Sequence, residues 1–161
     1  TGTVVKTTLS HGVDGCSDPN GTPSFAARHR DPSTGEMRAG KCGVMNGVTV
    51  SACFVFEGYE QRVDEYEVLV TEPGNVRWVR CQLQDPVPAN AIVVGASEKT
   101  HRYHMRGAVK FTHGDFFGPR TGMVPGEAVA VDGTFTDARI PYGGGGLLLS
   151  EFDVLVFAPS T

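Results

Sequence analysis

The segments DEYEVLV (residues 64–70) and SEFDVLV (residues 150–156) are near-copies of each other, 86 positions apart. An aromatic residue and a glycine upstream of each segment match at the same offset. Self-similarity at this spacing indicates a duplicated structural unit. The sequence therefore predicts two tandem repeats, residues 1–71 and residues 72–161. Each is too small to bury a core alone, so we expect a pseudo-twofold pair that shares one core and forms one globular unit.

Both predicted repeats consist of short runs rich in Val, Thr, Phe and Tyr, such as VTVSACFVF and RYHMRGAVKF. Many of the 21 glycines and 10 prolines fall between these runs, in stretches such as DPSTG and PYGGGG. Short alternating runs that are separated by turn residues are typical of strands joined by hairpins. No amphipathic helical stretch exceeds two turns. The sequence predicts an all-β fold.

The middle of the two repeats aligns at a different offset. GEMRAGKC (residues 35–42) matches GDFFGPRT (residues 114–121) at an offset of 79. The second repeat therefore carries about seven additional residues by this alignment, which we place in VPGEAVAVDGT (residues 124–134). Arg28 and Arg106 then occupy matching strands, where a structural role at the seam between the repeats is expected.

Composition narrows the classes of partner. The formal net charge of −4 and the pI of about 5.7 give no basic surface, so nucleic acid is not an expected partner. No apolar run approaches the ~20 residues that a membrane span requires. The four cysteines lack C-x-x-C spacing, and they are interpreted as buried thiols, with two disulfides as the alternative. The compartment stays open between extracellular and cytoplasmic, with extracellular favoured.

The stretch GEMRAGKC also approximates a phosphate-binding P-loop. Such a loop requires a buried strand before it, a helix after it, and a Ser or Thr hydroxyl for magnesium. Here Cys42 occupies the hydroxyl position and a strand-like, Gly-broken run follows. Nucleotide binding is therefore not expected.

The order of motifs resembles a known family. The second repeat runs W…VPANAIVVGA…YHMRGAV…GPR…IPYGGG…FDVLV from Trp78 to Val156. The first runs HGVD…FAARH…GEMRAGK…FEGYE…YEVLV from His11 to Val70. This order is similar to that of the DM-nine repeat over nearly the whole chain, although the first copy lacks the opening Trp and the P-x-N-A-I stretch.

The resemblance implies a function and a fold. Invertebrate proteins with two such repeats are mannose-specific lectins of innate immunity, with a β-prism-like fold and a tendency to form homodimers. The resemblance therefore implies a metal-free, cofactor-free lectin for mannose-containing glycans or microbial surface polysaccharide. The alternative is a recognition or targeting module of a pore-forming, natterin-like or otherwise membrane-acting protein. A structural or partner-binding role is the remaining possibility.

The resemblance also implies the sugar-binding residues. In the lectins an Asp in G-x-D and a Lys in P-G-K hold the sugar, and these positions correspond to Asp14 and Lys41. A carboxylate only accepts hydrogen bonds and an ammonium only donates them, so together they suit neighbouring sugar hydroxyls. Glu36 is a candidate second acceptor. An ordinary surface ion pair is the alternative interpretation of Asp14 and Lys41.

A possible second site departs from the family pattern. Ser97 stands where the second repeat should have Asp, Arg120 replaces Lys, and Asp115 matches Glu36. Trp78 is expected to pack between the repeats rather than to stack on a sugar. His101 and His104 are three residues apart, which on a strand places them on opposite faces, so a metal site is not expected.

An enzyme is not expected either. Glycosidases need two carboxylates flanking the bond. Glu36 with Glu57, or Asp14 with Glu36, are the available pairs, and neither has a sequence signature.

Overall fold

The computed structural model describes residues 2–3, 16–17, 23–45, 48–72, 74–111 and 120–158. These residues form one antiparallel sheet of thirteen strands and contain no helix, which confirms the all-β prediction. The strands are β1 (Gly2–Thr3), β2 (Ser24–Arg30), β3 (Met37–Met45), β4 (Val48–Phe56), β5 (Tyr59–Val63), β6 (Glu67–Val68), β7 (Val76–Gln82), β8 (Val93–Ser97), β9 (Thr100–Phe111), β10 (Arg120–Val131), β11 (Thr134–Tyr142), β12 (Gly145–Leu148) and β13 (Glu151–Phe157). In the part of the chain described, no helix could span a membrane.

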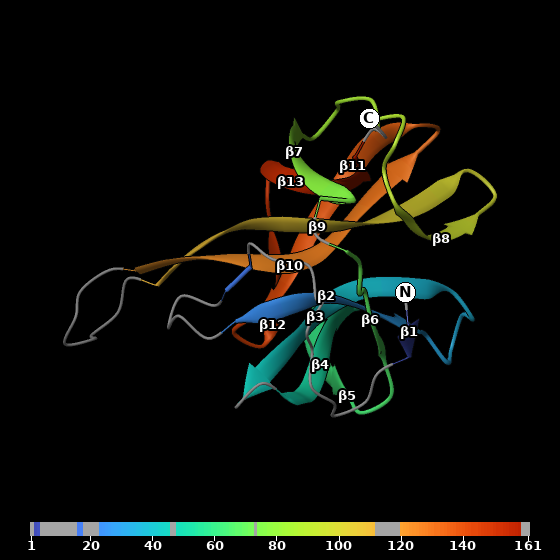
Figure 1. The fold of residues 1–161 in the computed structure, drawn as a ribbon. Coiled ribbons are helices and arrows are strands. Elements are labelled where there is room, and N and C mark those ends of the chain that lie inside the picture. Colours follow the sequence, from blue (N-terminus) through green and yellow to red (C-terminus); the bar gives the residue numbers. More distant parts are fainter. Residues whose placement is uncertain are drawn as a thin grey trace.

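The order of the strands is similar in the two halves of the chain. The sheet runs β1-β6-β2-β3-β4-β5 through the first repeat and then β12-β11-β10-β9-β13-β7 through the second, with β8 paired to β9. Read outward from the β5–β12 contact, the two halves contain equivalent strands in the same order. The sheet curls so that the first-repeat strands β2–β5 and the second-repeat strands β9–β11 lie in two layers (Figure 1).

Two backbone hydrogen bonds mark the pseudo-twofold relation at the centre of the sheet. The Glu60 N–H donates to the Gly144 carbonyl at 3.1 Å, and the Gly146 N–H donates to the Gly58 carbonyl at 3.0 Å. A shift of 86 positions exchanges one bond for the other. The repeats are therefore joined at this point by matching halves of the same contact.

The strand register corrects the alignment of the two repeats. Lys41 pairs with Cys53 across β3 and β4, and Glu127 pairs with Arg139 across β10 and β11. Both members of the second pair stand 86 positions after those of the first. The alignment of Lys41 with Arg120 is therefore wrong, and the structural counterpart of Lys41 is Glu127.

The additional residues of the second repeat also lie elsewhere than expected. Arg28 pairs with Ala39 across β2 and β3, and Arg106 pairs with Pro125 across β9 and β10. The second pair is separated by eight more residues than the first, and the register from β10 onward needs no further shift. The insertion therefore belongs to the β9–β10 hairpin and not to VPGEAVAVDGT, because β2 and β9 correspond at an offset of 78.

Apolar side chains gather in three clusters. One, which includes Met105, Phe135 and Phe152, lies within the second repeat, and a smaller one around Phe54 lies within the first. The third combines residues of both repeats: Ala26, Leu69, Ile92 and Leu155. Trp78 packs against this third cluster, as the sequence predicts. Each half thus has an apolar cluster of its own, and the third cluster packs residues of the two halves against each other.

All four cysteines are free thiols. Cys16, Cys42 and Cys81 are buried, and Cys53 is half-buried. Burial raises the pKa of the Cys42 thiol to about 12, because the thiolate would be desolvated. The interpretation as buried thiols is confirmed for three of the four, and the disulfide alternative does not occur.

Candidate functional site

Lys41 lies near the middle of β3, where the two repeats face each other. Its neighbours Gly40 and Cys42 face the first-repeat core. Because successive residues of a strand face opposite sides of the sheet, the Lys41 side chain points toward the second repeat. Its Nζ lies 3.9 Å from Glu60 Oε2 and 5.2 Å from the centre of the Tyr142 ring. Glu60 comes from the first repeat and Tyr142 from the second, so both repeats build the surroundings of Lys41.

The charges around Lys41 are held in place. Glu60 Oε1 accepts a hydrogen bond from the Gly144 N–H at 3.1 Å, which fixes the carboxylate beside the β5–β12 junction. Lys41 is buried, with its side chain 11% exposed, and the Glu60 side chain beside it is 22% exposed. An ammonium donor, a carboxylate acceptor and an aromatic ring meet here, a combination that suits a polyhydroxylated ligand.

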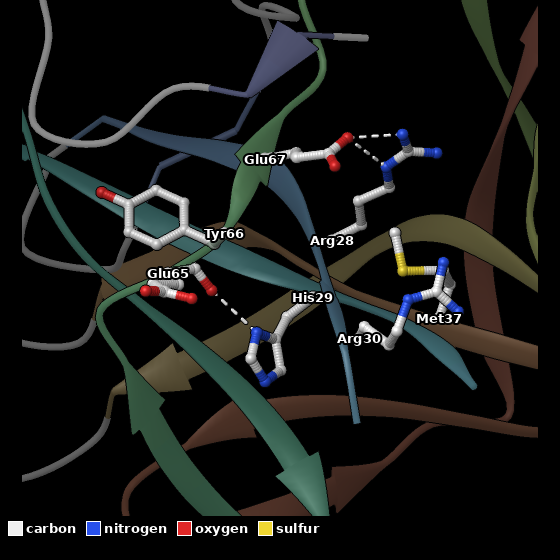
Figure 2. A pocket seen from close by; sticks show the side chains of 7 residues that line it. All are labelled: Arg28, His29, Arg30, Met37, Glu65, Tyr66 and Glu67. Carbon is white, nitrogen blue, oxygen red and sulfur yellow. Dashed lines mark hydrogen bonds and ion pairs between the residues drawn. The ribbon is translucent and has the colours of Figure 1, made fainter. Parts of the chain in front are cut away.

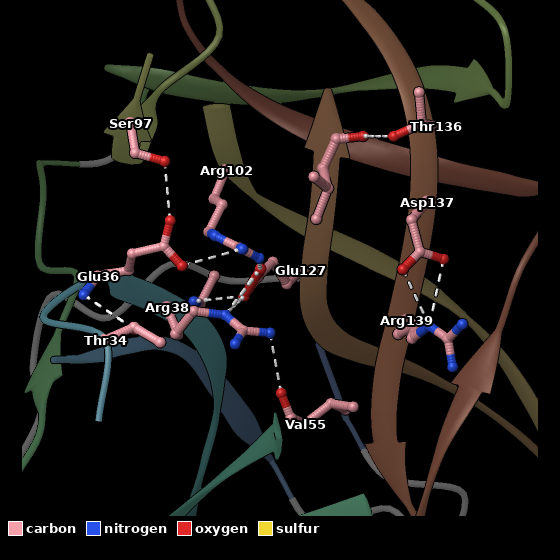
Figure 3. A network of polar contacts seen from close by, with 12 residues as sticks. Thr34, Glu36, Arg38, Val55, Ser97, Arg102, Glu127, Thr136, Asp137 and Arg139 are labelled. Atoms are coloured by element: carbon pink, nitrogen blue, oxygen red, sulfur yellow. Dashed lines mark hydrogen bonds and ion pairs between the residues drawn. The ribbon is translucent and has the colours of Figure 1, made fainter. Parts of the chain in front are cut away.

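Glu36 and Ser97, which the sequence assigns to different sites, lie together. Ser97 Oγ donates to Glu36 Oε1 at 2.8 Å, and Arg102 donates to Glu36 Oε2 at 3.2 Å (Figure 3). Glu36 is five residues from Lys41, which is about 16 Å along an extended chain. The structure therefore brings Glu36 to Ser97 and not to Lys41. Whether either residue binds sugar stays a prediction.

Glu127, the second-repeat counterpart of Lys41, is part of a buried network of ion pairs. Glu127 is buried, and its carboxylate accepts hydrogen bonds from Arg38, from Arg102 and from the backbone N–H of Ala39 (Figure 3). Arg38 and Ala39 belong to β3, so Glu127 attaches the strand that carries Lys41 to the second repeat. Sequence reasoning missed this residue, although P-G-E stands 86 positions after A-G-K.

The remaining predicted site residues are described only in part. Asp14 and Asp115 lie outside the described residues. The backbone of Arg120 begins β10 and pairs with Phe111. Their roles in sugar binding therefore stay predictions, while the position that matches Lys41 in the second repeat is Glu127.

Arg28 and Arg106 have equivalent structural roles, but their ion pairs do not lie at the seam between the repeats, where the sequence places them. Arg28 Nε donates to Glu67 at 2.7 Å, and Arg106 Nε donates to Asp153 at 2.9 Å. Glu67 and Asp153 are the matching acidic residues of YEVLV and FDVLV. One ion pair thus joins β2 to β6, and the other joins β9 to β13. Each lies within one repeat rather than across the seam.

His104 is buried at the seam and its ring Nδ1 has no hydrogen-bond partner among the described residues. Burial, with a smaller contribution from Arg28, lowers the pKa of His104 to about 3 from the ordinary 6.5. The described residues contain no group of three His, Cys, Asp or Glu side chains that could hold a metal ion.

We expect the stability to fall as the pH decreases below about 6.5. The unfolded chain then protonates His104 and the folded chain does not, so unfolding takes up a proton between the two pKa values. Asp31 and Asp153 also have lowered pKa values, but their protonation affects the free energy of unfolding only below about pH 4. Urea unfolding at pH 7, 6 and 5 measures the effect. A His104→Gln variant with the same pH dependence as the wild type would contradict it.

His29 borders two cavities that are lined by described residues of the first repeat. One of about 470 Å³ lies beside the Arg28–Glu67 ion pair, where the His29 Nδ1–H donates to the Glu65 carbonyl at 2.7 Å (Figure 2). The other, of about 450 Å³, lies between the hairpin that joins β2 to β3 and the hairpin that joins β4 to β5.

Comparison with known proteins identifies the family. A search of curated proteins finds no match to the chain. The family model of the DM9 repeat matches residues 18–118, which is more than half of the chain and spans the junction of the two repeats. The chain therefore belongs to the DM9 repeat family, a carbohydrate-binding type of domain.

Proposed function

We propose that the protein is a lectin that binds mannose-type glycans without a metal ion, with Lys41 as the principal contact. The observation that carries the proposal is the position of Lys41 between the Glu60 carboxylate and the Tyr142 ring at the seam between the repeats. Two adjacent hydroxyls of a pyranose can accept from the ammonium and donate to the carboxylate. The ammonium supplies the positive charge that a bound cation supplies in other sites.

The resemblance to the two-repeat lectins supports the finer parts of the proposal. It gives Asp14 as the partner of Lys41 and mannose as the preferred sugar. It also favours a role in innate recognition of microbial polysaccharide, as a homodimer. A shallow polar site binds a monosaccharide with a Kd of ~1 mM, about −4 kcal/mol. Two sites in one dimer would raise the avidity for a polymeric glycan.

Calorimetric titration of the wild-type protein tests this function. We expect mannose to bind with a Kd of ~1 mM in the presence of EDTA, and galactose to bind more weakly. A chromogenic mannoside should remain uncleaved, because we propose binding without turnover. Binding that disappears with EDTA would contradict the metal-free proposal. The absence of heat with mannose and with a mannose-rich glycan would contradict the lectin proposal itself.

A further inference from the structure

The cavity between the two first-repeat hairpins lies on the inner face of that repeat. Phe54 and Phe56 alternate with Cys53 and Val55 along β4, and Lys41 pairs with Cys53, so the cavity and Lys41 are on opposite faces of the sheet. Its walls include His29, Asp31, Arg38, Phe56, Gln61 and Val63. The cavity is therefore separate from the site of Lys41.

The same place in the second repeat is filled by apolar side chains. By strand register, the counterparts of His29, Asp31, Arg38, Phe56 and Val63 are Gly107, Val109, Val124, Tyr142 and Leu149. All but Gly107, over which Leu149 lies, belong to or pack against the second-repeat core. A Cβ added at Gly107 would meet Leu149 Cδ1 at 2.0 Å. One repeat thus has a packed core where the other has an open, polar cavity.

The two charged side chains of the wall, Asp31 and Arg38, are partly buried, and both are hydrogen-bonded. Asp31 Oδ1 accepts from the Ser33 N–H at 2.9 Å and from Ser33 Oγ at 2.8 Å. Arg38 binds Glu127 and also donates to the Val55 carbonyl at 3.0 Å. These bonds hold both side chains in place while the space between them stays open.

The lining indicates a neutral, polar ligand with one apolar face. Asp31 and Glu57 are acceptors, Arg38 is a donor, and the Gln61 amide is both. His29 and Phe56, whose ring centres are 6.1 Å apart, form the aromatic part of the wall. Two carboxylates against one guanidinium disfavour a phosphate or nucleotide, and the charged groups disfavour a purely apolar ligand. The volume lies within the usual range for small-ligand sites.

We propose that this cavity is a second saccharide site, which takes one pyranose unit of a mannose-type glycan. The class of ligand rests on the proposed function, whereas the site itself does not involve Lys41. The pseudo-twofold relation does not connect the two sites, because both lie in the first repeat on opposite faces of its sheet. The chain then holds glycan at two chemically different places.

The test uses mannotriose with EDTA, and separates this site from that of Lys41. We expect the Lys41→Ala variant to bind mannotriose more weakly than the wild type, and this residual binding to shift the His29 ring signals by NMR. Adding Gln61→Leu should weaken the remaining binding about tenfold, as expected for one lost hydrogen bond. Gln61 is exposed, and its second-repeat counterpart is Leu147, so the substitution suits the strand.

The outcomes distinguish this inference from the proposed function. If the wild type binds mannotriose and Lys41→Ala does not, the inference is overturned and the Lys41 site stands. Residual binding that leaves the His29 ring signals unmoved, or that Gln61→Leu leaves unchanged, also overturns it. If the wild type itself binds no mannotriose, both proposals are wrong.

Discussion

Replacing Glu127 with alanine is expected to lower the free energy of unfolding by about 3–5 kcal/mol, the usual cost of breaking a buried ion pair from one side. The Glu127 side chain is 6% exposed, and those of Arg38 and Arg102 are 18% and 16% exposed. Alanine would leave both guanidinium groups and the Ala39 N–H without their shared acceptor in a place that water reaches poorly. Urea unfolding measures the change.

The matched control is Asp137→Ala. Asp137 binds Arg139 at 2.9 Å, but both side chains are more than a third exposed. We expect a change of about 0–1 kcal/mol, as for other surface ion pairs. A loss in Glu127→Ala no larger than in Asp137→Ala would show that the Glu127 network does not join the repeats.

Replacing Gly126 with alanine is expected to cost about 3 kcal/mol or to prevent folding, at the upper end of the cost of overpacking. A Cβ at Gly126 would lie 2.2 Å from the Arg139 carbonyl oxygen, and one at Gly40 would lie 2.3 Å from the Cys53 carbonyl oxygen. These atoms belong to the backbone of the neighbouring strand, so no side-chain rotation relieves the clash. Thermal and urea unfolding of Gly126→Ala and Gly40→Ala measure the effect.

Gly145→Ala is the control for this prediction. Gly145 lies in β12, its φ is not positive, and an added Cβ would meet no atom within 4 Å. We expect a change within about 0.5 kcal/mol, as for other surface substitutions. Equal stability of Gly126→Ala and Gly145→Ala would contradict the close approach of β10 to β11. The match of Gly40 with Gly126 also explains why this glycine recurs beside Lys41 and Glu127.

The duplication could be predicted from the sequence because no insertion separates the C-terminal parts of the two repeats from each other's alignment. YEVLV and FDVLV, with the turns before them, stand at a constant offset from β3 and β10 onward. The middle was misaligned because the β9–β10 hairpin is longer than its counterpart. The similarity of GEMRAGKC to GDFFGPRT then matches Lys41 to Arg120, whereas the true counterpart, Glu127, has the opposite charge. The strand register identifies Glu127 as the counterpart of Lys41. That register depends on strand pairings that a single sequence does not display.

The candidate site could be predicted only through its motif. Lys41 follows from the resemblance to P-G-K, but Glu60 and Tyr142 come from two other hairpins and carry no local signal. Glu36 and Ser97 were identified but assigned to different sites, because the contact between β8 and the first repeat is not visible in the sequence. The tertiary contacts between the repeats, rather than the strands themselves, are what sequence patterns leave undetermined.

The affinity of Lys41→Ala for methyl α-mannoside, measured by calorimetry in EDTA, tests the central claim most directly. Lys110→Ala, which removes an exposed lysine of β9, is the matched control. The account predicts that binding falls at least about tenfold in Lys41→Ala, as expected when a charge-assisted hydrogen bond is lost, and that it stays unchanged in Lys110→Ala. Wild-type affinity in a folded Lys41→Ala protein would contradict the assignment of Lys41 as the sugar-binding residue.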